Sequence, residues 1–250
     1  MKKILSAVAL LTLGLAVPAA AADLPARTYS KAPAMVPPPV YNWGGFYIGA
    51  NGGGASSHKC WDFTTPAGAF IVSEGCHDAT GGVAGGQVGY RWQMSNFVFG
   101  VEAQGDWADL RGSNQSLAFG AFTNNSKVDA IGLFTGQVGY AWNNVLFYVK
   151  GGGAVTDNVY NGLITGSNAV IDSARETRWG GAVGAGLEVG FAPNWSVGVE
   201  YDHLFMGNRS LNFTNPAITV FTRADNIRQD VDIGTVRVNY RWGGPVIAKY

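Results

Sequence analysis

The chain has 250 residues, with 17 basic and 17 acidic side chains, and it is 47% hydrophobic and only 14% charged. A nucleic-acid-binding domain carries a basic excess on one face, and a disordered chain is poor in aromatic residues, whereas this chain has 13 Phe, 10 Tyr and 8 Trp. Both classes are therefore excluded, and no nucleic-acid partner is expected. A single all-β domain of this length is common.

The first 22 residues have the organisation of a secretory signal peptide. Lys2 and Lys3 precede an apolar run at 4–17, and four alanines at 19–22 end before Asp23. The apolar run is shorter than the ~20 residues of a membrane-spanning helix, and small residues follow it where signal peptidase cleaves. We therefore expect residues 1–22 to be removed on export, and this length disfavours the alternative of an uncleaved anchor helix.

A proline-rich segment follows at 23–42, with five prolines and no periodic apolar pattern. Such a composition predicts an extended linker, here on the periplasmic side. From Trp43 onward, the pattern changes to short alternating segments that are rich in glycine, valine and aromatic residues. This pattern predicts an all-β domain over 43–250.

Three similar segments lie at 85–107, 135–155 and 184–204, and each has the pattern of a strand, a tight asparagine-containing turn and a second strand. Together with the flanking sequence they predict eight strands, at 43–55, 80–93, 97–107, 128–142, 145–155, 177–191, 195–206 and 229–242. Each strand is long enough to cross a bilayer, because ~9 to 11 tilted residues suffice.

The connections between these strands alternate in length. Three are short, and four are long and rich in Asn, Ser, Thr and Gly, at 56–79, 108–127, 156–176 and 207–228. Outer-membrane barrels have short periplasmic turns and long external loops. We therefore expect an eight-stranded antiparallel up-and-down transmembrane β-barrel in the outer membrane, with both termini in the periplasm; an aromatic-rich soluble β-sandwich is the alternative.

Apolar and polar residues alternate along the strands, so that they lie on opposite faces of the sheet. We expect the apolar face to contact lipid and the polar face to line the lumen. Aromatic side chains near the short turns are expected to form an interfacial girdle. Its predicted members are Tyr90, Trp92, Tyr140, Trp142, Phe191, Trp195, Tyr240 and Trp242. In the last strand Val231 and Ile233 have the opposite parity to Val236, and a bulge near Gly234 is expected to reconcile them.

The polar parity is expected to form a charge network in the lumen. Its predicted members are Arg91, Glu102, Asp106, Asp129, Lys150, Arg178, Glu188, Glu200, Asp202, Arg237 and Arg241. Eight strands leave an interior only just wide enough for side chains, so these charges must pair, as in the example of Arg91 with Glu102, or be wetted. A ring of one sign would favour an ion-selective pore. The mixture favours a closed lumen and a structural role, and a narrow passive porin for small solutes is the alternative.

Cys60 and Cys76 are expected to form a disulfide, because an exported protein meets oxidising conditions. Closing a loop of this size contributes about 3 kcal/mol in the chain-entropy model. A zinc site that includes the flanking His58 and His77 is the alternative, although the spacing matches none of the usual zinc patterns.

A search for catalytic groups finds no candidate site. His203 follows Asp202, but adjacent strand residues point to opposite faces and do not form a dyad easily. The chain has neither a G-x-S-x-G nor an H-E-x-x-H motif. We therefore expect no enzyme activity, no cofactor and no metal.

Several motifs resemble the porin-family small outer-membrane β-barrel proteins of alphaproteobacteria, which are similar to the OmpA transmembrane barrel. They are the leader ending AAADLPARTY, the opening WGGFYIGANGG at 43–53, the repeated GGQVGYRW and TGQVGYAW, and the ending VRVNYRWGGPVIAKY at 236–250. The resemblance implies an abundant surface barrel that contributes to envelope integrity and host interaction, with no shared catalytic motif.

The same resemblance implies partners. They are outer-membrane lipid and lipopolysaccharide, the barrel-assembly machinery during biogenesis, and a host or environmental ligand at the external loops. Assembly machinery typically reads an aromatic residue that ends the last strand. Here this signal is either Tyr240 with Trp242, or Tyr250 after a continued strand.

Overall fold

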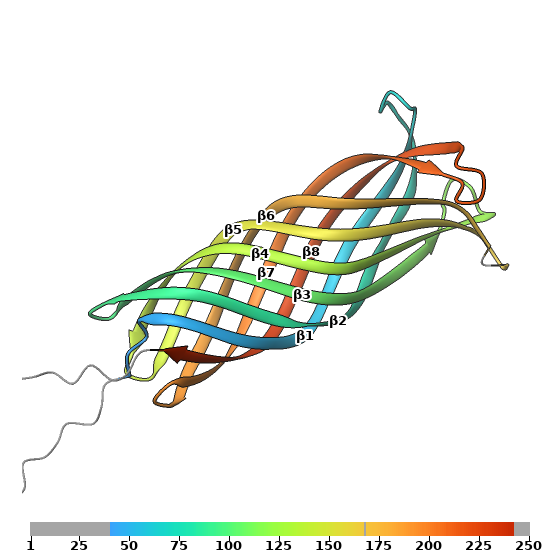
Figure 1. Ribbon diagram of the computed structural model, residues 1–250. Coiled ribbons are helices and arrows are strands. Elements are labelled where there is room, and N and C mark those ends of the chain that lie inside the picture. Colours follow the sequence, from blue (N-terminus) through green and yellow to red (C-terminus); the bar gives the residue numbers. More distant parts are fainter. Residues whose placement is uncertain (1–40, 168, 243–250) are drawn as a thin grey trace, which may run out of the picture. The chain divides into compact units, whose positions relative to one another are not determined.

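Eight antiparallel strands close into one barrel in the order β1 to β8 (Figure 1). The computed structural model describes residues 41–167 and 169–242. The strands are β1 (Gly45–Thr64), β2 (Phe70–Met94), β3 (Phe97–Gln115), β4 (Phe122–Trp142), β5 (Val145–Ile164), β6 (Val170–Ala192), β7 (Trp195–Thr214) and β8 (Phe221–Trp242). β1 pairs with β8 as well as with β2, which leaves no open sheet edge. The predicted all-β up-and-down barrel is confirmed.

Some predicted features lie outside the described residues. They are the signal peptide at 1–22, most of the linker at 23–42, and Tyr250. β8 ends at Trp242. In the described part of the chain, no helix has both the length and the apolar character needed to cross a membrane.

The strands extend much further than predicted at one end of the barrel. The four segments predicted as long loops are mostly strand, and the connections there shrink to 65–69, 116–121, 165–169 and 215–220. Each extension pairs with at least one extended neighbour, so hydrogen bonding between backbones supports it largely independently of its side chains. A composition rich in Asn, Ser, Thr and Gly was therefore a poor guide to where the strands end.

The opposite end carries three two-residue turns, at 95–96, 143–144 and 193–194, as predicted. Asn143 has φ 55°, in the left-handed region that tight hairpin turns require. The side-chain amide of Asn96 donates a hydrogen bond to the carbonyl of Ala141 at 2.9 Å, and that of Asn144 donates to the carbonyl of Gly190 at 3.0 Å. Each of these two turns is therefore hydrogen-bonded to the neighbouring strand. We call this the turn end, and the opposite one the loop end.

Bulges in β4 and β7 change which side chains face the interior. In β4, Val128 pairs with Asn158 while Ala130 pairs with Asp157, so Asp129 is an extra residue. A one-residue insertion reverses the alternation, because the side-chain period of a strand is two. β7 has a similar bulge. Phe205 pairs with Asp230 of β8 while Gly207 pairs with Gln229, so Met206 is an extra residue, and Gly207 adopts φ 67°.

β8 has no bulge at Gly234, contrary to the prediction. Its pairing with both neighbours runs without a shift through that position. Val231 and Ile233 therefore keep the parity of Thr235 and Arg237, and all four side chains point into the barrel and are buried. These two apolar residues belong to the interior and not to the lipid-facing surface.

Candidate functional site

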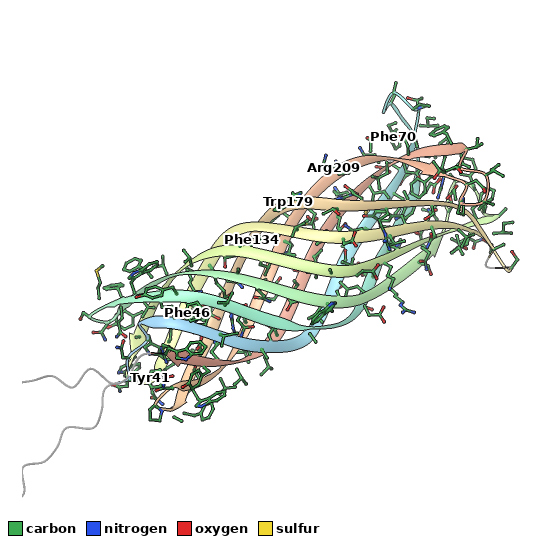
Figure 2. The ribbon with its side chains drawn as sticks, viewed as in Figure 1. Tyr41, Phe46, Phe70, Phe134, Trp179 and Arg209 are labelled. Carbon is green, nitrogen blue, oxygen red and sulfur yellow. A yellow bond between two sulfur atoms is a disulfide. The ribbon has the colours of Figure 1, made fainter. Side chains whose placement is uncertain are left out.

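The outward face of the turn-end half is apolar. Figure 2 labels Phe46, Phe134, Trp179, Arg209 and Phe70 in order from the turn end to the loop end. The first three are exposed members of an apolar band that includes Val138, Val149, Val199 and Val236. Beyond this band charged side chains such as Arg111 and Arg175 appear on the outer face, and exposed apolar residues such as Phe70 occur at the loop end. An apolar outer surface of this kind is what a bilayer requires of a barrel.

The predicted girdle residues all lie on β2, β4, β6, β7 and β8 near the turn end. Seven of them are exposed on the outer face, and Tyr240 is half-buried. Several stack on one another: the ring centroids of Tyr90 and Trp92 are 4.8 Å apart, and those of Trp195 and Tyr240 are 5.1 Å apart. The arrangement is the one that an aromatic belt at a membrane boundary would have.

A connected network of charged side chains fills the interior of the turn-end half. Its members come from β2, β3, β5, β6, β7 and β8, and they are Arg91, Glu102, Lys150, Glu188, Glu200, Asp202 and Arg237. Arg237 bonds both Glu102 and Glu200. Lys150 Nζ lies 2.7 Å from Glu200 Oε1 and 3.2 Å from Asp202 Oδ1. Buried charges are tolerated only when paired in this way.

Tyrosine hydroxyls complete the network. Tyr47 donates to Glu102 at 2.6 Å, and Tyr148 donates to Glu200 at 2.5 Å. The partner of Arg91 is not the Glu102 of the predicted example. Arg91 Nη2 lies 2.9 Å from Glu188 Oε2, on the far side of the barrel, and its guanidinium stacks 4.4 Å from the Tyr47 ring centroid. The interior is therefore crossed by direct side-chain pairs.

Four other predicted members make no ion pair with these seven. Asp106 is buried and is linked to Lys150 through Gln104, which donates to Asp106 at 2.8 Å and accepts from Lys150 at 3.4 Å. Arg178 is buried in the loop-end half, where it pairs with Glu176 at 2.9 Å. Arg241 is buried at the turn end, and its guanidinium lies 4.7 Å from the Tyr41 ring and 5.0 Å from the Trp43 ring.

For Asp129, the fourth of these residues, the predicted position in the lumen is wrong. Its carboxylate is on the outer face, 2.5 Å from Lys127 Nζ and 3.7 Å from Arg175 Nη2. The prediction placed it in the lumen by counting back from Gln137 with an unbroken alternation. The bulge at 129–130 breaks that count.

An apolar layer lies across the middle of the barrel, between the charge network and the loop end; we call it the waist. All eight strands contribute to this buried cluster. Its members are Ala55, Ala79, Val83, Ala108, Leu110, Val128, Ile131, Leu133, Ala154, Ala182, Leu204, Met206, Val231 and Ile233. This layer was not predicted, because the alternation of the strands indicates an interior that is polar throughout.

An aromatic cluster in the interior of the loop-end half was also not predicted. Trp61, Tyr160, Phe213 and Ile227 form a buried cluster there. Buried Lys59 lies beside it, with Nζ 4.5 Å from the centroid of the Tyr160 ring. The sequence carries a signal for these residues: the two-residue spacing of inward residues in the last strand continues back to position 227. Regarding 207–228 as a loop hides it.

Cys60 and Cys76 form the expected disulfide, from directly opposed positions of β1 and β2. His58 Nε2 lies 3.5 Å from Cys60 Sγ on the outer face, but His77 bonds Asn114 and Ser126 instead. Since the two sulfurs are bonded to each other, they offer no thiolates, and the four predicted zinc ligands do not converge. The zinc alternative has no support in this arrangement.

The histidine near Asp202 pairs with another residue. His203 Nδ1 lies 2.7 Å from Asp232 Oδ1 on the outer face, and Tyr201 donates to the same oxygen at 2.6 Å. Asp202 points inward to Lys150, as adjacent strand residues must diverge. The cluster is an ordinary surface hydrogen-bond group, with no serine, threonine or cysteine among these contacts.

Comparisons with known proteins agree with the geometry. Residues 7–241 match the sequence profile of the family described as outer membrane protein beta-barrel domain. A 31 kDa outer-membrane immunogenic protein of Brucella melitensis biotype 1 is 30% identical over 227 residues, covering 85% of this chain and 89% of the relative. A 22 kDa outer membrane protein of Rhizobium leguminosarum bv. viciae is 33% identical over 165 residues, covering 65% and 64%.

Among solved structures, the outer membrane protease OmpT of Escherichia coli matches with a TM-score of 0.53 and 8% identity, over 79% of this chain and 97% of that protein. At such low identity the likeness shows the fold alone, and it carries no argument for proteolysis.

Proposed function

This chain belongs to the outer membrane protein β-barrel family, and from that premise we propose that it is a structural barrel of the outer membrane whose lumen is closed. The observation that carries the proposal is the combination of two barriers in series along the barrel axis. Paired charges fill the turn-end half, and the apolar waist lies directly beyond them.

Each barrier opposes a different kind of solute. A hydrated ion that entered the turn-end half would have to separate pairs such as Lys150 with Glu200, and so leave a buried charge uncompensated. A polar solute that passed it would then have to lose its water among side chains such as Leu133 and Leu204. Neither step is favourable, which supports a structural role over the alternative of a narrow porin.

The loop end is proposed to face outward from the cell, with the turn end and both termini in the periplasm. Supporting observations are the short turns at one end and the charged outer face of the other half, where Arg111 and Arg175 are exposed. An epitope tag inserted at 117–119 should be labelled by antibody on intact cells. Labelling only after the outer membrane is permeabilised would reverse the orientation.

The exposed cations beyond the apolar band are proposed to contact lipopolysaccharide. Arg111, Lys127 and Arg175 lie on the outer face at this level, where phosphate groups of surrounding lipid would meet them. Replacing all three by glutamine should weaken lipopolysaccharide retention during purification, measured as phosphate per barrel. Unchanged phosphate would contradict this contact.

Planar-lipid conductance of the refolded mature chain tests the closed lumen. Gel heat-modifiability confirms in parallel that the barrel has folded. We expect a folded barrel without discrete current steps. Reproducible steps from a folded barrel would overturn the proposal and make the chain a porin.

A matched double variant separates the two roles further. Arg91→Gln with Glu188→Gln removes one whole pair and leaves no unpaired charge behind. A structural network predicts lower barrel stability without current. Altered ion selectivity with unchanged stability would instead identify the pair as part of a conducting path. Arg111→Gln with Asp109→Gln, an exposed pair on the outer face, is the control.

A further inference from the structure

A cavity lies at the loop end, above the aromatic cluster of the interior. It has a volume of about 300 Å³, and its walls come from β1, β2, β4, β5, β6, β8 and the 116–121 connection. Phe63, Phe119, Phe122 and Ile171 form its apolar side. Phe119 and Phe122 are both exposed, so the cavity is reachable from solvent. Its volume is at the lower end of the range of about 300–1,000 Å³ for small-molecule sites.

The polar side of the cavity contains Glu74, Asp172 and Arg223. Arg223 already has more carboxylates than it can neutralise. Its Nη1 lies 3.1 Å from Glu74 Oε2 and its Nε lies 3.1 Å from Asp172 Oδ2. Asp225 adds a third carboxylate, with Oδ2 3.3 Å from Arg223 Nη1. Three carboxylates face one guanidinium, so full ionisation leaves two negative charges in excess.

Asp225 shows the imbalance most clearly. Its side chain is completely buried, and within the described chain neither of its oxygens accepts a hydrogen bond. Burial raises the pKa of this carboxyl; Arg223 opposes the rise and the charges of Glu74 and Asp172 add to it, and the net result is a pKa of about 7. A buried carboxyl in this state benefits from any nearby positive charge.

The geometry points to a site for a small organic cation, namely a primary ammonium group on an aryl or alkyl body. The carboxylates of Glu74 and Asp172 line the polar side and accept hydrogen bonds from an ammonium group. Phe63 and Phe119, in edge-to-face contact with centroids 5.4 Å apart, form a wall for the apolar body and offer a ring face to the charge.

An anionic ligand fits this site poorly. The guanidinium of Arg223 is the cation that an anion would need, and it is held between three carboxylates, with its face covering the Phe213 ring at 4.7 Å. An entering carboxylate or phosphate would have to displace one of these partners and would add a further negative charge.

Binding of 2-phenylethylammonium to the refolded full barrel in lipid nanodiscs tests the assignment. Equilibrium dialysis gives the dissociation constant, with 2-phenylethanol and phenylacetate as the neutral and anionic analogues. We expect the ammonium compound to bind at least tenfold more tightly than the alcohol, and phenylacetate not to bind detectably. Empty nanodiscs measure partition into lipid.

Two variants locate the site. Asp172→Asn should weaken binding of the ammonium compound about tenfold and leave the alcohol unchanged. Asp109→Asn removes the same charge from the exposed outer face and should change neither. Phe122→Ala leaves every charge in place and should weaken both compounds several-fold, so it tests the cavity even if Asp172→Asn fails to fold.

Several results would overturn the assignment. They are equal binding of the ammonium compound and the alcohol, equal loss in Asp172→Asn and Asp109→Asn, or tightest binding of phenylacetate. None of them depends on whether the barrel conducts, so this site and the closed lumen can fail separately.

Discussion

The turn-end and loop-end halves of the barrel continue the same eight strands but are built differently on both faces. In the turn-end half the outer face is apolar and the interior holds the charge network. In the loop-end half the outer face carries charged groups such as Arg111 and Lys127, while the interior combines an aromatic cluster around Trp61 with a separate group of ion pairs around Arg223. The waist and the bulges at 129–130 and 206–207 lie at the boundary between the two halves.

The difference shows that the backbone ladder and the side-chain alternation are separate constraints. Backbone pairing continues into the loop-end half, because every strand keeps at least one paired neighbour there. The medium outside decides only which side chains are favoured on each face. An ion pair at the interior of the turn-end half and an ion pair on the outer face of the loop-end half should therefore differ strongly in their energetic weight.

Arg237→Met should give the largest effect. It leaves Glu102 and Glu200 without their shared cation inside the barrel. Removing one partner of a buried pair costs about 3–5 kcal/mol. Arg111→Met, at an exposed arginine of the other half, should cost no more than about 1 kcal/mol. Urea unfolding in lipid vesicles, followed by tryptophan fluorescence, measures the unfolding free energy of both variants. Equal losses of unfolding free energy would contradict the difference between the two halves.

Leu133→Ala tests the waist. Leu133 is fully buried in a layer to which all eight strands contribute. Truncating a buried leucine costs about 2–5 kcal/mol, because a cavity is left behind. Val138→Ala, on the lipid-facing side of the same strand, is the control and should cost less. The same unfolding assay applies. A negligible cost at Leu133 would show that the waist is loosely filled.

Asp225 should make the loop-end half sensitive to pH. Its folded pKa of about 7 exceeds the ordinary value of 3.8, so the native state retains a proton that the unfolded chain releases. Stability from this group is therefore present at low pH and is lost as pH rises from about 4 to about 7, by at most about 1.4 kcal/mol per unit. Asp225→Asn should flatten the pH dependence of the unfolding free energy measured between pH 4 and pH 7. Identical pH profiles would contradict the assignment.

Asp129→Asn should have the smallest effect. Its carboxylate pairs with Lys127 on the outer face, in contact with solvent, and such pairs contribute about 0–1 kcal/mol. Glu188→Gln, which removes the buried partner of Arg91, should cost several times more. A large loss in Asp129→Asn would mean that this aspartate has a structural weight that its position does not explain.

The sequence by itself determined the fold class, the three tight turns and the lipid-facing side of the turn-end half. These features depend on local patterns: asparagine-containing turns such as 95–96, and strict alternation in segments such as 97–107. A side-chain period of two is readable wherever no residue is inserted. The disulfide of Cys60 with Cys76 was likewise expected from the redox compartment alone.

Only the tertiary structure decided the length of the strands, the waist and the partners of the charges. Strand length depends on whether neighbours extend together, which composition does not encode. The waist and the outward position of Asp129 depend on a bulge, because one extra residue reverses the alternation for the remainder of β4. Arg91 meets Glu188 because closure of the ring brings opposite walls within reach, and that closure is a property of all eight strands together.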